Sequence, residues 1–156
     1  MIKKINYFLQ AIFIYSFFLI GRILGIKISR KIFAFLFRFI GPFFKSKEII
    51  KKNLKIFSKN FSDLEMNKIT NNMWKNYGMT FIEYMFLDYF RKTDTHIEVH
   101  DDYQIASYIN ENKPVIFISG HFANFELMSM EIVKKNIKLA TIYRPLNNIF
   151  LNPLME

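Results

Sequence analysis

The first 44 residues most limit how this chain can fold, because they form a long apolar stretch with basic residues set into it. Tyr7–Ile20 reads YFLQAIFIYSFFLI, in which Gln10 and the small Ser16 are the only residues that are neither apolar nor aromatic. A helix that spans a bilayer needs about 20 apolar residues. The run therefore spans only if Arg22 is tolerated within the helix or extends its charge to the interface. No small-residue cleavage site follows, so a retained anchor is favoured over a cleaved signal peptide.

A second apolar segment, Ile32–Phe44, carries Arg38 and is too short to span a membrane. It suits an interfacial helix on anionic lipid, with a buried core helix as the alternative. We therefore expect a membrane anchor and an interfacial helix in residues 1–45, followed by a folded domain in residues 46–156. Because positive residues accumulate on the cytoplasmic side of membranes, that domain is expected on the cytoplasmic face.

Positive charge is concentrated at the N-terminus. Residues 1–52 hold eleven Lys and Arg and one acid, whereas residues 53–156 hold eleven basic residues and twelve acids. A basic segment can bind nucleic acid or an anionic membrane. Phe, Ile and Leu fill the gaps between these charges, so membrane lipids are the expected partner and nucleic acid is not. The chain has no cysteine, which excludes disulfides, a thiolate nucleophile and cysteine metal sites.

A long helix is predicted from about Asp63 to about Phe90. Ser62 and Glu65 have the spacing of a capping box, and apolar residues recur at helical intervals after it. Gly78 interrupts this pattern without ending it, which indicates close packing against another element. Trp74 is expected in the core or at an interface.

The pattern changes after residue 93. Alternating or continuous apolar runs predict strands, and two intervening segments have helical composition. The predicted strands are His96–His100, Val115–Ser119 and Leu139–Tyr143, and the predicted helices are Asp102–Asn112 and Phe122–Lys135. Strand, helix and strand in this order indicate a parallel βαβ unit. The expected fold class is therefore α/β, with an N-terminal membrane helix, further helices and a partial βαβ domain.

The candidate catalytic residues are His121 and Glu126, in the pattern His-x4-Glu. The spacing alone is weak, because His96 and Asp101 match it as well. His121, however, lies where a predicted strand ends and a helix begins, which is where α/β proteins place active sites. Glu126 could accept a hydrogen bond from one imidazole nitrogen while the other acts as a general base on a hydroxyl. Ser119 lacks the glycine pattern of a nucleophile elbow.

His96, Glu98 and His100 would share one face of a strand, where they could form a metal site. Exposed polar strand faces are much commoner than such sites, so no metal is expected. The sequence contains no P-loop, dinucleotide-binding glycine pattern or zinc motif, and no cofactor is expected.

Three segments resemble those of one family in the same order, after a comparable N-terminal anchor. GHFANFE (120–126) resembles the His-x4-Asp/Glu signature of glycerolipid-type acyltransferases, in the glutamate form of the late acyltransferases of lipid A biosynthesis. NNMWKNYGMTFIEY (71–84) resembles the helix that precedes this signature in the family. IYRPLNN (142–148) resembles the arginine-containing segment that follows it.

The resemblance implies an inner-membrane enzyme that transfers a fatty acyl chain from acyl carrier protein to a hydroxyl of a lipid A precursor. His121 would deprotonate that hydroxyl and Glu126 would orient His121. Arg144 corresponds to the motif arginine and would bind the oxyanion or a substrate phosphate, with a surface arginine as the alternative. Asn124 would orient a ligand or complete the first helical turn, and Glu83 would be structural.

Two other functions compete with this one. The same chemistry could act on glycerol phosphate or a lysophospholipid, or the chain could be an inactive membrane-anchored interaction module. Members of the family are about twice as long, so we expect the rest of the catalytic fold to lie outside this sequence and the fragment to be inactive.

Overall fold

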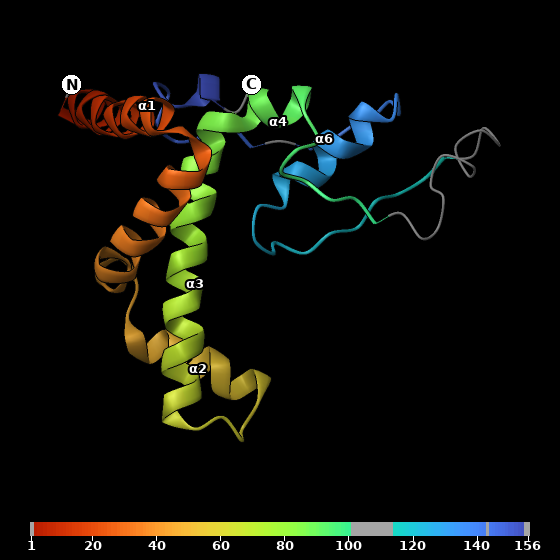
Figure 1. Cartoon of the computed structure of the whole chain (residues 1–156). Helices are drawn as coiled ribbons and strands as arrows, with labels where there is room; N and C mark the ends of the chain where they lie inside the picture. The colour runs from red at the N-terminus through yellow and green to blue at the C-terminus, as the bar shows by residue number, and fades with distance from the viewer. Residues whose placement is uncertain (1, 101–113, 143, 155–156) are drawn as a thin grey trace. The chain divides into compact units, whose positions relative to one another are not determined.

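The computed structural model describes residues 2–100, 114–142 and 144–154, in which every regular element is a helix (Figure 1). The elements are α1 (Ile2–Phe44), α2 (Lys47–Phe57), α3 (Asp63–Glu83), the 3₁₀ helix η1 (Tyr84–Phe86), α4 (Leu87–Lys92), α6 (Glu126–Lys134) and the 3₁₀ helix η2 (Asn152–Leu154). The chain divides into two compact units. One unit is Phe13–Met85, and the other combines Met1–Ile12 with Phe86–Glu156.

Helix α1 contains a kink at Gly25, whose φ of 73° and ψ of 163° are not helical. A positive φ is readily adopted only by glycine, which explains why the helix bends at this residue. The kink frees carbonyl groups that would otherwise accept helical hydrogen bonds. The buried Ser29 hydroxyl lies 2.9 Å from the Gly21 carbonyl oxygen and 2.7 Å from that of Gly25, so its one proton is shared between these two acceptors.

Three glycines hold α1 and α3 close together within the unit of residues 13–85. Gly21 packs against Ile82, Gly41 against the Trp74 ring, and Gly78 against the backbone carbonyl of Phe33. Since the α1 positions rise as the α3 positions fall, the two helices run antiparallel. A side chain at position 78 would overlap the Phe33 carbonyl. This confirms the close packing predicted at Gly78 and places Trp74 in the core.

An aromatic cluster fills the interface between α1 and α3. The Phe81 ring lies 5.3 Å from that of Phe18, 5.8 Å from Phe33 and 5.4 Å from Phe37, measured between ring centroids. Such aromatic contacts contribute about 0.5–1.5 kcal/mol each beyond the area that they bury. An ion pair lies beside this cluster, with Arg30 Nε 2.7 Å from Glu83 Oε1. Glu83 is buried, and this pairing supports the structural role expected for it.

The capping box at the start of α3 is confirmed. Ser62 Oγ accepts a hydrogen bond from the Glu65 amide, and Glu65 Oε2 accepts one from the Ser62 amide. The Ser62 hydroxyl also donates to Glu65 Oε2, and this bond, followed by that from the Ser62 amide, lowers the pKa of Glu65. The predicted helix is nevertheless not continuous to Phe90, because η1 separates α3 from α4.

Helix α1 is long and apolar enough to cross a membrane. Large apolar side chains are exposed along its length, including Phe13, Leu19, Ile23, Phe35, Phe39 and Phe43. In the second half of the helix, Phe33 is buried while Phe35 is 64% exposed. In the segment Ile32–Phe44, one face therefore packs on α3, as a core helix would. The other face is apolar and exposed, as in an interfacial helix.

We predict that detergent, and not high salt, will release the protein from membranes. Salt screens the attraction of basic residues to anionic lipid but does not weaken burial of the apolar face of α1. The measurement is the fraction of protein that remains with sedimented membranes after each wash. Complete release by salt would show that the N-terminal segment binds only through charge.

The βαβ prediction is corrected in its strands. In the part of the chain that the structure describes, residues 97–100, 114–119 and 139–142 are irregular, and no strand ladder joins them. Ile116, Ile118 and Ile142, which lie in the predicted strands, are exposed. A strand needs a hydrogen-bonded partner, and a two-stranded pair is only marginally stable by itself. The helix predicted at Asp102–Asn112 lies outside the described residues.

Two of the three segments predicted as strands nevertheless lie near one another. Residues 114–117 and 137–142 line a shared cavity of about 850 Å³, together with Met128, Ser129 and Ile132 of α6. The helix predicted at Phe122–Lys135 forms over Glu126–Lys134. The helix predicted between these two segments is therefore present, whereas the described residues form no sheet.

Candidate functional site

The residues before α6 form a tight turn that presents His121. The Phe122 amide donates a hydrogen bond to the Gly120 carbonyl oxygen at 2.8 Å, which makes His121 the central residue of a γ-turn. The Phe122 ring folds over Gly120, where a side chain would overlap it. Ala123 follows with a φ of 47°, and this left-handed residue redirects the chain into α6.

The His121 side chain is exposed and stacks on Phe125. The two ring centroids lie 4.2 Å apart and the planes differ by 20°. No hydrogen bond or ion pair joins His121 to Glu126 among the described residues. Catalytic hydrogen bonds commonly tighten only when substrate binds. The pairing of His121 with Glu126 therefore stays a prediction.

Glu126 is the first residue of α6 and is half-buried. The positive end of the helix dipole favours a carboxylate at this position. Glu126 lines a cavity of about 710 Å³ that also includes Arg91 of α4 and Lys134 of α6. Two basic side chains thus share one cavity with the motif carboxylate.

Lys134 is held in place by two carboxylates. Its Nζ lies 2.7 Å from Glu131 Oε1 and 3.0 Å from Asp94 Oδ1. The interaction of the Lys134 ammonium with the Glu131 carboxylate is the main cause that raises the pKa of Lys134, and its bond to Asp94 adds to it. Lys134 therefore carries its charge at neutral pH and ties the end of α6 to the segment after α4.

The other predicted site residues are not joined to His121. Asn124 is half-buried, and its backbone carbonyl accepts a bond from the Leu127 amide at 3.3 Å, so its main chain helps to start the first turn of α6. Arg144 is exposed in an irregular segment. Within the described ranges, no hydrogen bond or ion pair links Arg144 with His121 or Glu126. The Ser119 hydroxyl donates to the Gly120 carbonyl oxygen.

Asparagines organise the segment after Arg144. Asn148 Nδ2 donates to the Tyr7 carbonyl oxygen at 2.9 Å, and its Oδ1 accepts from the Phe150 amide at 3.1 Å. Asn152 Oδ1 accepts from the Leu146 amide. The Phe150 ring packs edge-on against Phe8. Within the unit of residues 1–12 and 86–156, these contacts fasten the segment to the start of α1.

The alternative motif at His96 lies in a different setting. The His96 ring is 5.6 Å from that of Tyr89 and 6.4 Å from that of Phe90. His100 Nε2 lies 3.3 Å from Glu98 Oε1, and both side chains are exposed. Asp101, the acid of this second match, lies outside the described residues.

Arg91 and Lys134 were missed by the sequence reasoning. Lys134 is eight residues after Glu126 on α6, so helical periodicity places both on a similar face and could have revealed it. Arg91 reaches the cavity from α4, which is 34 residues before α6 in the chain. No sequence pattern signals that proximity.

Comparison with known proteins identifies the family. The family of bacterial lipid A biosynthesis acyltransferases matches residues 2–156. No curated protein and no solved structure gives a significant match. The matched region includes α1, α3 and the complete GHFANFE segment. Since the match extends over nearly the whole chain, this protein belongs to the bacterial lipid A biosynthesis acyltransferase family.

Proposed function

We propose that the protein takes part in transfer of a fatty acyl chain from acyl carrier protein to a hydroxyl of a lipid A precursor. The observation that carries this proposal is the family match over residues 2–156. The exposed imidazole of His121 in front of α6 supports it, because a general base must reach a hydroxyl on a separate substrate molecule.

In the proposed reaction, His121 removes the proton from the acceptor hydroxyl as its oxygen attacks the thioester carbonyl carbon. The carbon–sulfur bond then breaks, an ester forms, and the thiolate of acyl carrier protein receives the proton from the imidazolium. Glu126 would stabilise that imidazolium and fix the tautomer of the ring. The step needs no metal or redox partner, because only a proton and an acyl group move.

Arg144 and Asn124 are proposed as substrate-binding residues. The exposed guanidinium of Arg144 suits the developing oxyanion or a phosphate of the acceptor. Asn124 stands in the turn between His121 and Glu126, where its amide could orient a ligand. Arg91 and Lys134 also line the cavity of Glu126, and each is already paired with carboxylates, Arg91 with Asp88 and Lys134 with Asp94 and Glu131.

The proposed location is the cytoplasmic face of the bacterial inner membrane. The apolar exposed face of α1 would hold the protein in the lipid. Basic residues concentrated in residues 1–52 favour the cytoplasmic side. Both the lipid acceptor and the soluble acyl donor can reach a protein held at this surface.

The test is an acyl-transfer assay with the product of the intact reading frame, purified in detergent. Labelled acyl–acyl carrier protein is supplied with a lipid A precursor, with glycerol phosphate or with a lysophospholipid. We expect the label to appear on the lipid A precursor. Transfer only to glycerol phosphate or to the lysophospholipid would reassign the acceptor, and no transfer to any of them would contradict an enzymatic role.

A further inference from the structure

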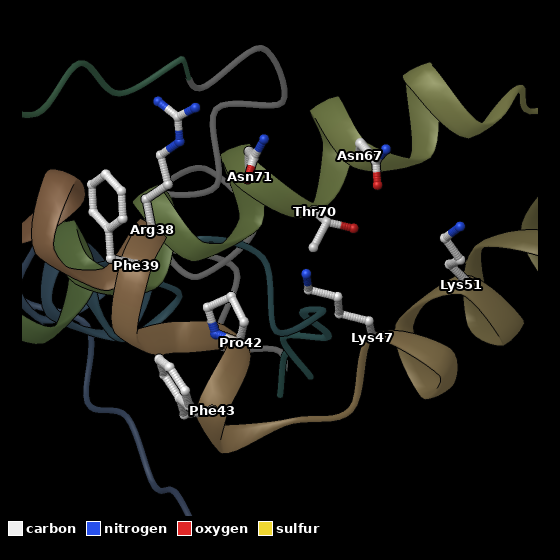
Figure 2. Close-up of a pocket in the computed structure, with 9 residues that line it drawn as sticks. All are labelled: Arg38, Phe39, Pro42, Phe43, Lys47, Lys51, Asn67, Thr70 and Asn71. Atoms are coloured by element: carbon white, nitrogen blue, oxygen red, sulfur yellow. The ribbon is translucent and has the colours of Figure 1, made fainter.

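A pocket unrelated to the acyltransferase motif lies between α1, α2 and α3. It has a volume of about 720 Å³, and its lining includes Arg38, Phe39 and Phe43 of α1, Lys47 of α2, and Asn67 and Asn71 of α3. In Figure 2, Lys47 extends from the start of α2 toward Thr70 of α3, whereas the Arg38 guanidinium points away from Lys47. The whole pocket belongs to the unit of residues 13–85.

The basic residues of this pocket come from different helices. Lys51 also lines it and is 2.9 Å from Asp63 Oδ1, so its charge is largely balanced. Arg38 and Lys47 have no ion-pair partner among the residues that the structure describes, and no acid lines the pocket. Arg38 and Lys47 therefore line this pocket without an ion-pair partner in that part of the chain. Their positive charge favours binding of an anion over binding of a cation or a neutral ligand.

Hydrogen-bond donors from α3 complete the polar side of the pocket. The amides of Asn67 and Asn71 can each donate to an anion. The Thr70 hydroxyl donates to the Met66 carbonyl oxygen at 2.8 Å, so its proton is already used. Guanidinium, ammonium and amide groups together are the donors that bind phosphate oxygens.

The other side of the pocket is apolar and open. Phe39 is 55% exposed and Phe43 is 90% exposed. Both lie on α1, whose exposed apolar residues continue beyond the pocket through Phe35 and Phe44. A ligand held here would have its anionic group among the basic residues and an apolar surface beside it.

We propose that this pocket binds the phosphate headgroup of an anionic bilayer phospholipid. Cations scattered on a solvated surface would attract an anionic membrane without selecting one molecule. Here Arg38 and Lys47 line one pocket from separate helices, and the exposed phenylalanines offer a surface for the acyl chains of the same lipid. The headgroup would fix the position of residues 38–51 relative to the membrane surface.

The experiment measures lipid retention by the whole chain, reconstituted in nanodiscs of mixed phosphatidylglycerol and phosphatidylcholine. After extraction into detergent, native mass spectrometry counts each phospholipid that stays bound. The test variant carries Arg38→Gln and Lys47→Gln. The matched control carries Lys52→Gln and Lys55→Gln, which remove the same charge from α2 outside the pocket. Circular dichroism confirms that both variants keep the helical content of the wild type.

We expect the wild type and the control to retain phosphatidylglycerol in preference to phosphatidylcholine. The pocket variant should retain roughly tenfold less of it than the control, because two charge-assisted contacts are lost. Equal loss in both variants, or no preference in the wild type, would overturn the proposal. Displacement of the lipid by an excess of inorganic phosphate would reassign the pocket to a soluble phosphate and would also overturn it. None of these outcomes depends on acyl transfer, so they are independent of the proposed function.

Discussion

Replacing His121 with alanine is expected to reduce acyl transfer by roughly 10²–10⁴-fold, the contribution typical of a general base. The side chain is exposed beside α6 and stacks on Phe125, so its removal should not disturb folding. Membrane association should be unchanged, because α1 is far from this residue in the chain. The measurement is the initial rate with purified acyl carrier protein and lipid A precursor, in the protein from the intact reading frame.

Two further variants show whether the site is placed correctly. Glu126→Gln should reduce turnover strongly but less completely, since an amide can still accept a hydrogen bond from the ring without stabilising the imidazolium. His96→Ala should be close to neutral. If His96→Ala is as harmful as His121→Ala, the wrong motif has been chosen. Near-normal turnover of His121→Ala would rule out the general-base mechanism.

The largest effect on stability is expected at Gly78. A methyl group at this position would overlap the Phe33 carbonyl oxygen and approach Phe37 Cβ within 2.9 Å. Because the first of these is a backbone atom, the two helices must separate. Overpacking of this kind costs about 1–3 kcal/mol and sometimes more. The better helix propensity of alanine recovers about 1 kcal/mol of this.

We therefore expect Gly78→Ala to lower the thermal midpoint of unfolding by several degrees, measured by circular dichroism in detergent. Asn72→Ala is the control, because residue 72 is exposed on the same helix and gains similar helix propensity without a clash. The control should be neutral or slightly stabilising. A Gly78→Ala protein as stable as the control would mean that the backbones of α1 and α3 do not approach as closely as the structure indicates.

Local signals in the sequence were enough to predict several elements. The capping box at Ser62 and Glu65 depends on residues three apart, and the apolar run of α1 depends on composition. Both formed as expected, because short-range geometry determines them. Gly78 also indicated a contact, because glycine destabilises a helix and close packing against another element can offset that destabilisation. The motif that led to the family is likewise continuous in the sequence.

Only the tertiary structure decided the features that depend on distant residues. The strands predicted at 115–119 and 139–143 need hydrogen bonds from partner segments, and an apolar run cannot show whether these form. Arg91 reaches the cavity of Glu126 because α4 lies close to α6, and Arg38 and Lys47 line one pocket because it is formed by residues of α1, α2 and α3. The sequence by itself determined which local elements are possible, because their interactions lie within a few residues. Packing decided which side chains share a site, because those contacts join residues far apart in the chain.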